Sequence, residues 1–156
     1  GYSSYQGYKL WGDTAPTSSV FTVREDYTTN ASGVTYVAYV FAPVNGFSKM
    51  GKYQGNGASG DGNFVFTGFR PSYLIVKNFA SENWLMIDSA RDPVNPVDRN
   101  LFPDNGNIDS SIIVADFLSN GFKARNAGGA YIISGVGSNY LYWAFAESPF
   151  KFSRAV

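Results

Sequence analysis

Apolar and polar residues alternate in short runs along most of the chain, with a period of two rather than the 3.6 of a helix. Such runs predict short β-strands, and the Gly, Asn and Pro residues between them predict turns. The predicted strands are 20–23, 34–42, 63–67, 73–77, 84–88, 112–118, 122–125, 131–133 and 140–146. Together they predict an all-β fold of about ten short strands with little or no helix, arranged as an antiparallel β-sandwich or jelly roll.

One strand-like phrase occurs twice, about a hundred residues apart. It occupies residues 36–42 and again 140–146, and a proline follows each copy. In the stretch 34–42 both faces carry apolar side chains, which predicts a central strand buried on two sides. The repetition predicts that residues 1–47 are an N-terminal arm with the trailing strands of a preceding repeat-like unit, and that residues 48–156 are a complete β-sandwich module.

Two further segments have clear local signals. Residues 89–107 hold three of the seven prolines and many Asp and Asn residues, which predicts a long irregular loop. Ser119-Asn120-Gly121 predicts a tight turn, because Asn-Gly supplies the positive φ angles that a two-residue hairpin needs.

Composition narrows the classes of function. Hydrophobic residues make up 44% of the 156 residues and aromatic residues 17%, enough to fill a core. The 12 basic and 12 acidic side chains cancel, so nucleic acid is not expected as a partner. No apolar run approaches the length of a membrane-spanning helix, so membrane insertion is not expected. The absence of Cys and His excludes thiolate metal sites and histidine-based acid–base chemistry.

The densest polar stretch lies between residues 88 and 109, and its second half contains a candidate calcium site. Calcium takes six to eight oxygen ligands in a flexible shell. The candidate ligands are Asp104, Asn105, Asn107 and Asp109, which flank a glycine. The alternative is that these side chains form Asx-turns and bond the loop backbone. No other cofactor is expected.

The first half of the same stretch contains candidate ligand-binding residues, with a glycan as the expected ligand. They are Asp88, Arg91, Asp92, Asn95 and Asp98, to which the aromatic Trp11 is added because an aromatic ring can stack on a sugar. The alternative for Trp11 is packing on a neighbouring subunit. The alternative role of Arg91 is to pair with the neighbouring carboxylates. Trp84 and Trp143 lie inside predicted strands and are expected in the core or between the sheets.

Two carboxylates that flank a sugar ring can hydrolyse a glycan. The pairs to consider are Asp88 with Asp92 and Asp104 with Asp109. No recognisable hydrolase motif accompanies either pair, and we expect no enzymatic activity.

Several phrases, in order along the chain, resemble one family. They are GFRPSYLIVK at 68–77 and the stretches 83–84, 88–93, 116–123 and 142–151, while 14–21 followed by 36–47 resembles the end of a preceding copy in tandem proteins. Over roughly residues 11–151 the chain is similar to an uncharacterised module of tail-fibre-like and other virion proteins of tailed, often marine, bacteriophages. The resemblance implies a β-sandwich of lectin-like or jelly-roll type carried on a virion. It implies no established enzymatic activity and no particular binding residues.

We therefore expect a structural virion protein, in a tail fibre or related appendage, that assembles as a homo-oligomer. Its expected partners are other copies of itself and other virion proteins, with host cell-surface polysaccharide as a further one. The first alternative is a capsid decoration or cement protein. The second is a glycan-binding, lectin-like adhesin without a structural role.

Overall fold

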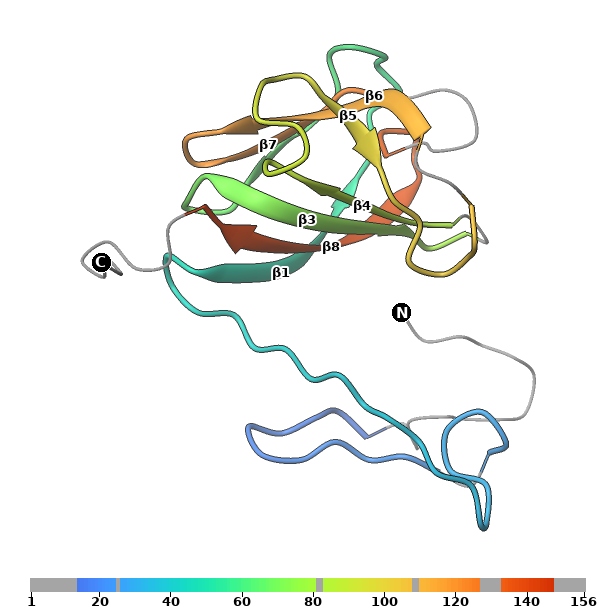
Figure 1. Ribbon diagram of the computed structural model, residues 1–156. Coiled ribbons are helices and arrows are strands. Elements are labelled where there is room, and N and C mark those ends of the chain that lie inside the picture. The colour runs from blue at the N-terminus through green and yellow to red at the C-terminus, as the bar shows by residue number, and fades with distance from the viewer. Residues whose placement is uncertain (1–13, 25, 81–82, 108–109, 127–132, 148–156) are drawn as a thin grey trace. The chain divides into compact units, whose positions relative to one another are not determined.

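The computed structural model describes residues 14–24, 26–80, 83–107, 110–126 and 133–147. Within these residues the chain forms two four-stranded antiparallel sheets that pack face to face, and no helix (Figure 1). The strands are β1 (Ser48–Gln54), β2 (Phe64–Phe66), β3 (Pro71–Asn78), β4 (Trp84–Asp88), β5 (Val97–Asn100), β6 (Ser110–Leu118), β7 (Gly121–Ala124) and β8 (Asn139–Ala146). No helix among the described residues is long and apolar enough to cross a membrane. The predicted all-β sandwich is confirmed.

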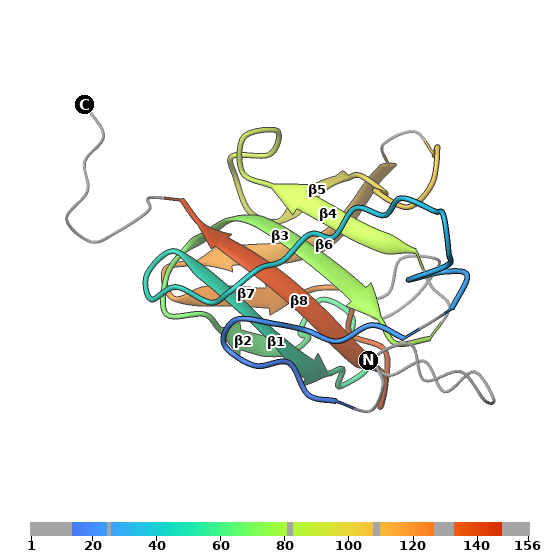
Figure 2. The same cartoon turned by 90° about the horizontal axis from the view of Figure 1, so that it is seen from below.

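The first sheet has the strand order β1-β8-β3-β4 and the second has the order β2-β7-β6-β5. In the first sheet β8 is central, since it pairs antiparallel with β1 on one side and β3 on the other, which puts Trp143 opposite both Met50 and Ile75. Figure 2 shows β1, β8, β3 and β4 side by side from below. In the second sheet the hairpin β6–β7 turns at Ser119 and Asn120, so the predicted turn is present. Gly121 is not one of its two turn residues, because it pairs with Leu118 as the first residue of β7, and it is not among the glycines with positive φ.

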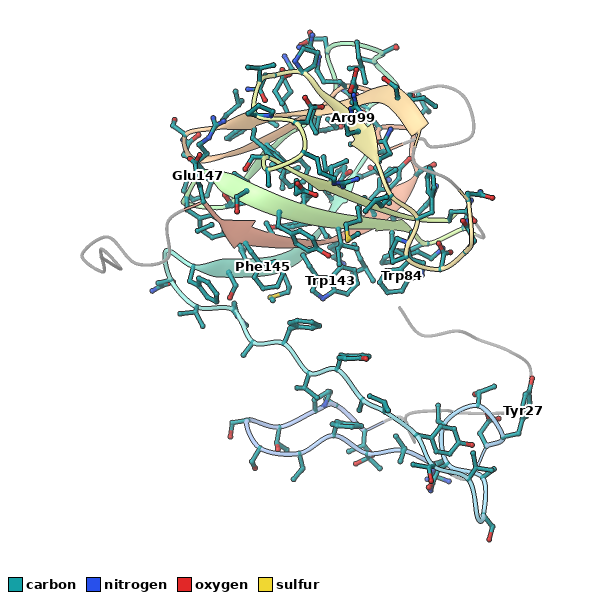
Figure 3. The ribbon with its side chains drawn as sticks, in the orientation of Figure 1. Tyr27, Trp84, Arg99, Trp143, Phe145 and Glu147 are labelled. Atoms are coloured by element: carbon teal, nitrogen blue, oxygen red, sulfur yellow. The ribbon has the colours of Figure 1, made fainter. Side chains whose placement is uncertain are left out.

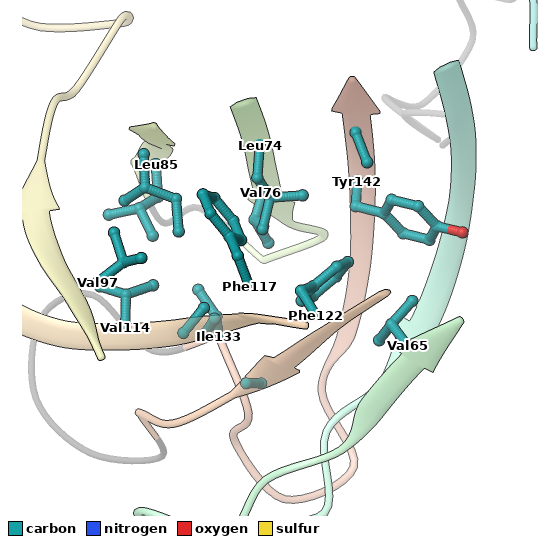
Figure 4. Packing of buried hydrophobic residues seen from close by; sticks show 14 of the residues in the cluster. Val65, Leu74, Val76, Leu85, Val97, Val114, Phe117, Phe122, Ile133 and Tyr142 are labelled. Atoms are coloured by element: carbon teal, nitrogen blue, oxygen red, sulfur yellow. The ribbon is translucent and has the colours of Figure 1, made fainter. Parts of the chain in front are cut away.

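The core lies between the two sheets (Figure 4). Alternate residues of β3 and β8 enter it, among them Leu74, Val76 and Tyr142, and Phe117 and Phe122 meet them from the second sheet. Tyr140 of β8 is fully buried and stacks on the ring of Tyr53 from β1, with the ring centroids 5.1 Å apart. Full burial of one such side chain contributes about 1.5–3 kcal/mol, so this alternating row supplies much of the driving force for folding.

The strands predicted at 63–67, 73–77, 84–88, 112–118, 122–125 and 140–146 are confirmed as β2, β3, β4, β6, β7 and β8. The predicted strand 131–133 falls mostly on residues outside the described part. The prediction was wrong for 20–23 and 34–42, which form no strand. Residues 34–42 are all exposed, not buried on two sides. A strand needs the backbone of a neighbouring strand to pair with, and the sequence pattern does not reveal whether one is present.

Two strands arise where none was predicted. β1 contains two lysines and a glycine in seven residues, which hides the alternation of apolar side chains. β5 lies inside the stretch 89–107, which was predicted to be an irregular loop, and that prediction was wrong for Val97–Asn100. Val97 and Asn100 are buried, so the ends of this short strand anchor it against β6.

The chain divides into two compact units between Phe41 and Ala42. The first unit contains a turn in which the N–H of Thr28 donates to Asp26 Oδ1 over 2.8 Å. The Tyr36 hydroxyl donates to the Tyr27 carbonyl over 2.8 Å and accepts from the Ala31 N–H over 3.0 Å. Local hydrogen bonds therefore shape this unit, whereas the sandwich is built from sheet pairing and a buried core.

Candidate functional site

Asp88 and Arg91 form a local pair at the end of β4. One carboxylate oxygen of Asp88 accepts hydrogen bonds from the backbone N–H groups of Ala90 and Arg91, at 3.1 and 2.8 Å, and the other accepts from Arg91 Nε at 2.6 Å. Burial alone would raise the pKa of Asp88, but these hydrogen bonds and the Arg91 charge together hold it below its ordinary value. Arg91 Nη1 and Nη2 are buried and make no hydrogen bond to a described residue. Arg91 therefore takes the alternative role of a partner for the carboxylate.

Three other predicted ligand-binding residues bond groups of β5 or β6. Asp92 accepts from the N–H groups of Asp98 and Arg99, at 2.5 and 3.2 Å. The Asn95 amide donates to the Phe117 carbonyl and accepts from its N–H, both over 2.8 Å, as a neighbouring strand would. Asp98 accepts from the Ser111 hydroxyl over 3.1 Å. These contacts hold the loop and β5 against β6, and each of them uses a polar atom of a residue that was predicted to bind a ligand. Trp11 lies outside the described residues.

Two of the candidate calcium ligands accept hydrogen bonds from backbone N–H groups. Asp104 Oδ1 accepts from the Trp84 N–H over 3.1 Å, and Asn105 Oδ1 accepts from the Asn107 N–H over 2.9 Å. Asp109 lies outside the described residues. In the part of the chain that the structure describes, no three Asp, Glu, Cys or His side chains come together to hold a metal ion. The contact of Asn105 is an Asx-turn, as in the alternative, whereas the contact of Asp104 joins the loop to the first residue of β4.

The outer face of the first sheet carries a row of large apolar side chains, which we call the aromatic face. Its residues come from all four strands and are each partly buried: Met50, Tyr73, Ile75, Trp84, Met86, Leu141, Trp143 and Phe145. The indole rings of Trp84 and Trp143 stack, with centroids 5.4 Å apart and an interplanar angle of 22°. Tyr73 and Phe145 lie 5.8 Å apart in a tilted arrangement.

Figure 3 shows Trp84, Trp143 and Phe145 on the same side of the first sheet, pointing away from the second sheet. Trp84 and Trp143 were expected in the core or between the sheets, and this was wrong because they occupy the alternate strand positions that face outward. A signal for this face is present in the sequence. In 140–146 Leu141, Trp143 and Phe145 alternate with buried residues, so both faces of the strand are apolar.

A second apolar surface lies in the first unit and at its boundary. Residues 34–42 form no strand, and Val37, Tyr39 and Val40 are 76%, 83% and 74% exposed. Their sequence repeats that of β8, which is the most extensively paired strand of the first sheet. We call residues 34–42 the apolar segment. A folded domain rarely leaves several large apolar side chains exposed in one short stretch.

A family model described as a domain of unknown function, DUF7483, matches residues 2–149. The match covers residues 2–41 of the first unit as well as the sandwich. No curated protein and no solved structure matches the chain. The extent of the family match shows that the chain belongs to the DUF7483 family, whose function is unknown.

Proposed function

We propose that the chain is a structural virion protein that assembles with copies of itself in a tail fibre or related appendage. The observation that carries the assembly is the apolar segment, which has the sequence of a central strand and is exposed along its whole length. The placement on a virion rests on the resemblance of 68–77 and the phrases after it to modules of phage virion proteins.

The apolar segment exposes enough apolar area for its burial to support a stable association. Val34, Tyr36, Val37, Tyr39 and Val40 are all exposed large hydrophobic residues. Each such side chain contributes about 1.5–3 kcal/mol when it is fully removed from water. Their sum is comparable with the roughly 4–15 kcal/mol that association costs in lost freedom of motion. The net charge of zero adds little repulsion between copies.

Light scattering of the full chain at several concentrations tests the assembly. We expect a mass that is a multiple of 17.0 kDa. A triple variant with Val37→Ser, Tyr39→Ser and Val40→Ser loses apolar area that association buries. Its dissociation constant is therefore expected to be at least about tenfold higher than that of the native chain.

The matched control is a second triple variant with Val94→Ser, Val136→Ser and Phe79→Ser. These residues are 70%, 79% and 50% exposed and lie on loops of the sandwich. We expect this variant to keep the mass of the native chain. A native chain that is monomeric at every concentration would contradict the homo-oligomer and would favour the decoration-protein alternative, which co-sedimentation with capsids would then test.

Glycan binding is a second candidate function, favoured by the stacked Trp84 and Trp143 on the aromatic face. Indole rings bind sugars because their flat apolar faces match the C–H face of a pyranose ring. Titration with host-surface polysaccharides, with and without calcium, should quench tryptophan fluorescence. The variants Trp84→Ala and Trp143→Ala should weaken the binding, whereas Phe79→Ala, on an exposed turn, should leave it unchanged. No quenching by any polysaccharide would remove this candidate.

A further inference from the structure

The two sides of β1 differ in what they meet. On one side the Phe47 carbonyl accepts from Ala146 N–H and the Gly55 N–H donates to Ser138, at 2.8 and 2.9 Å. Since bonded and non-bonded residues alternate along an antiparallel pair, the backbone groups of Met50, Lys52 and Gln54 point to the opposite side. The strand order puts no other strand there among the described residues. Among the residues that the structure describes, this side of β1 is therefore an open sheet edge.

The other three edge strands of the sandwich are covered or short. The N–H and carbonyl of Leu101 bond Met86 at 2.9 Å each, which covers the middle of β4. Asp92 accepts from the Asp98 and Arg99 N–H groups of β5. β2 is only three residues long. β1, with seven residues, is therefore the longest edge strand in the described part of the chain, and an open edge of this kind is a template for an added strand.

The apolar segment has the sequence that such a strand requires. Residues 36–42 repeat β8, and β8 already pairs antiparallel with β1 on its other side. Val37, Tyr39 and Phe41 correspond to Leu141, Trp143 and Phe145 of the aromatic face. Added beside β1 in the orientation of β8, residues 36–42 would match the seven residues of β1 in length.

The turn that leads into β1 is closed by a single bridge. Val44 and Ser48 exchange two backbone hydrogen bonds, at 3.0 and 2.9 Å, and this antiparallel bridge is isolated. The next pair in the same register, Ala42 with Met50, does not form. A second copy offers the same segment and the same edge. Two copies can exchange their segments about a twofold axis, so that each edge receives one strand.

We infer that the open edge of β1 in one copy binds residues 36–42 of a second copy as an added antiparallel strand. The inference rests on the proposed self-assembly and names the site at which copies meet. Backbone hydrogen bonds supply affinity in such strand addition, and the alternate side chains supply specificity.

The absence of cysteine from the chain makes a cross-linking test direct. Val40→Cys is mixed with Lys52→Cys, one of them labelled with ¹⁵N, and treated with a short bis-maleimide. Peptide masses then identify which thiols are joined. The matched control replaces Lys52→Cys by Arg99→Cys, since Arg99 is also an exposed basic residue on an edge strand, β5 of the second sheet. We expect the 40–52 product to exceed the 40–99 product at least about tenfold, because strand addition brings only the first pair together.

An edge-blocking substitution gives an independent measurement. The N–H of Lys52 points to the open edge, so Lys52→Pro removes a donor for the incoming strand and keeps the hydrogen bonds of β1 to β8. Loss of a backbone hydrogen bond is expected to weaken the self-association measured by light scattering about tenfold. Lys52→Ala, which keeps the N–H, should leave it unchanged.

The outcomes separate the inference from the proposed assembly. Cross-links between two copies of Val40→Cys alone, or equal 40–52 and 40–99 products, in a chain that still assembles, would overturn the β1 edge as the binding site and leave assembly standing. An intramolecular link in the double variant Val40→Cys, Lys52→Cys, with no link between copies, would show the segment on its own chain. A native chain that stays monomeric and gives no product above background would overturn both.

Discussion

Residues 36–42 and β8 have nearly the same sequence pattern and opposite structural roles. In β8 the residues Tyr140, Tyr142 and Ala144 are buried in the core, and the strand has a neighbour on each side. In the other copy Tyr36, Ala38 and Val40 are exposed, and the residues form no strand. The pattern encodes a preference for a sheet, and the tertiary structure decides whether the sheet is present.

The sandwich and the first unit are also stabilised by different interactions. The sandwich has a contiguous core, whereas the first unit has Asx-type and tyrosine hydroxyl hydrogen bonds between nearby residues. Local bonds of this kind each contribute only about 0.5–1.5 kcal/mol. We therefore expect changes in the first unit to alter assembly and changes in the sandwich to alter folding.

Hydrogen exchange should show the largest difference between the two copies of the phrase. Amides of β8 open only with the sandwich, so at a concentration where the chain is monomeric they should be protected by a factor of at least about 10³. Peptides covering 36–42 should exchange at nearly the rate of an unfolded chain. Mass spectrometry at increasing concentration should then show protection of 36–42 rising as copies associate. Full protection of these residues in the monomer would mean that they pair within their own chain.

Truncation of the matching tyrosines should separate the two regions by several kcal/mol. Tyr140 is fully buried, stacks on Tyr53 and accepts the Gly135 N–H over 2.9 Å, so Tyr140→Ala should destabilise the sandwich by about 3–5 kcal/mol. The control is Tyr36→Ala at the corresponding position of the exposed copy, which should change the unfolding free energy by less than about 0.5 kcal/mol. Urea unfolding measures both, and a loss of similar size in the two variants would contradict the comparison.

The fold could be predicted where side chains alternate clearly, as in 73–77 and 140–146. It could not be predicted for β1, where Lys49, Gly51 and Lys52 interrupt the pattern. Lys49 nevertheless has a place beside the second sheet, since its ammonium group donates to the Phe66 carbonyl over 3.0 Å and lies 5.0 Å from the centre of the Phe66 ring. Such long-range contacts define β1 and have no signature in local sequence.

The candidate site could be predicted only as a polar loop. Asp88, Asp92 and Asn95 lie in or next to the predicted polar loop. Their side-chain oxygen atoms accept hydrogen bonds from backbone N–H groups of the loop, of β5 or of β6. Sequence spacing does not tell whether an Asp oxygen meets a ligand or an N–H of the same loop. The aromatic face was missed for a different reason. A Trp inside a strand, such as Trp143, faces inward or outward according to register, and register depends on pairing.

The Asp88 turn gives a pH-dependent test of the sandwich with a counterpart in the first unit. The Asp88 pKa is lowered in the folded state, so its stabilisation is present above the unfolded-state value near 3.9 and is lost as the pH falls through the folded-state pKa. Asp88→Asn should cost about 1–2 kcal/mol at pH 7, because it loses charge-assisted hydrogen bonds. Urea midpoints from pH 7 to pH 2 should show this difference shrinking below about pH 4.

The counterpart is Asp26→Asn, in the turn where Asp26 accepts from the Thr28 N–H. This change should leave the stability of the sandwich within about 0.5 kcal/mol at every pH, because Asp26 belongs to the first unit. If the Asp88→Asn difference stays constant down to pH 2, the ionised Asp88 carboxylate does not stabilise the fold.

Two glycines with the same backbone conformation provide the smallest difference. Gly33 in the first unit and Gly46 in the turn before β1 have φ angles of +75° and +73°, and a Cβ at either would meet no atom within 4 Å. An alanine at either position is therefore strained only by the positive φ angle of its backbone, which costs about 1 kcal/mol in each case. Gly46→Ala strains the turn that leads into the sandwich and should lower its melting temperature by about 4–8 °C. Gly33→Ala places the same strain outside the sandwich, so its melting temperature should stay within about 2 °C of the native value. Equal shifts in the two variants would mean that both units unfold in one cooperative transition, and the exposed copy of the phrase would then contribute to folding as well as to assembly.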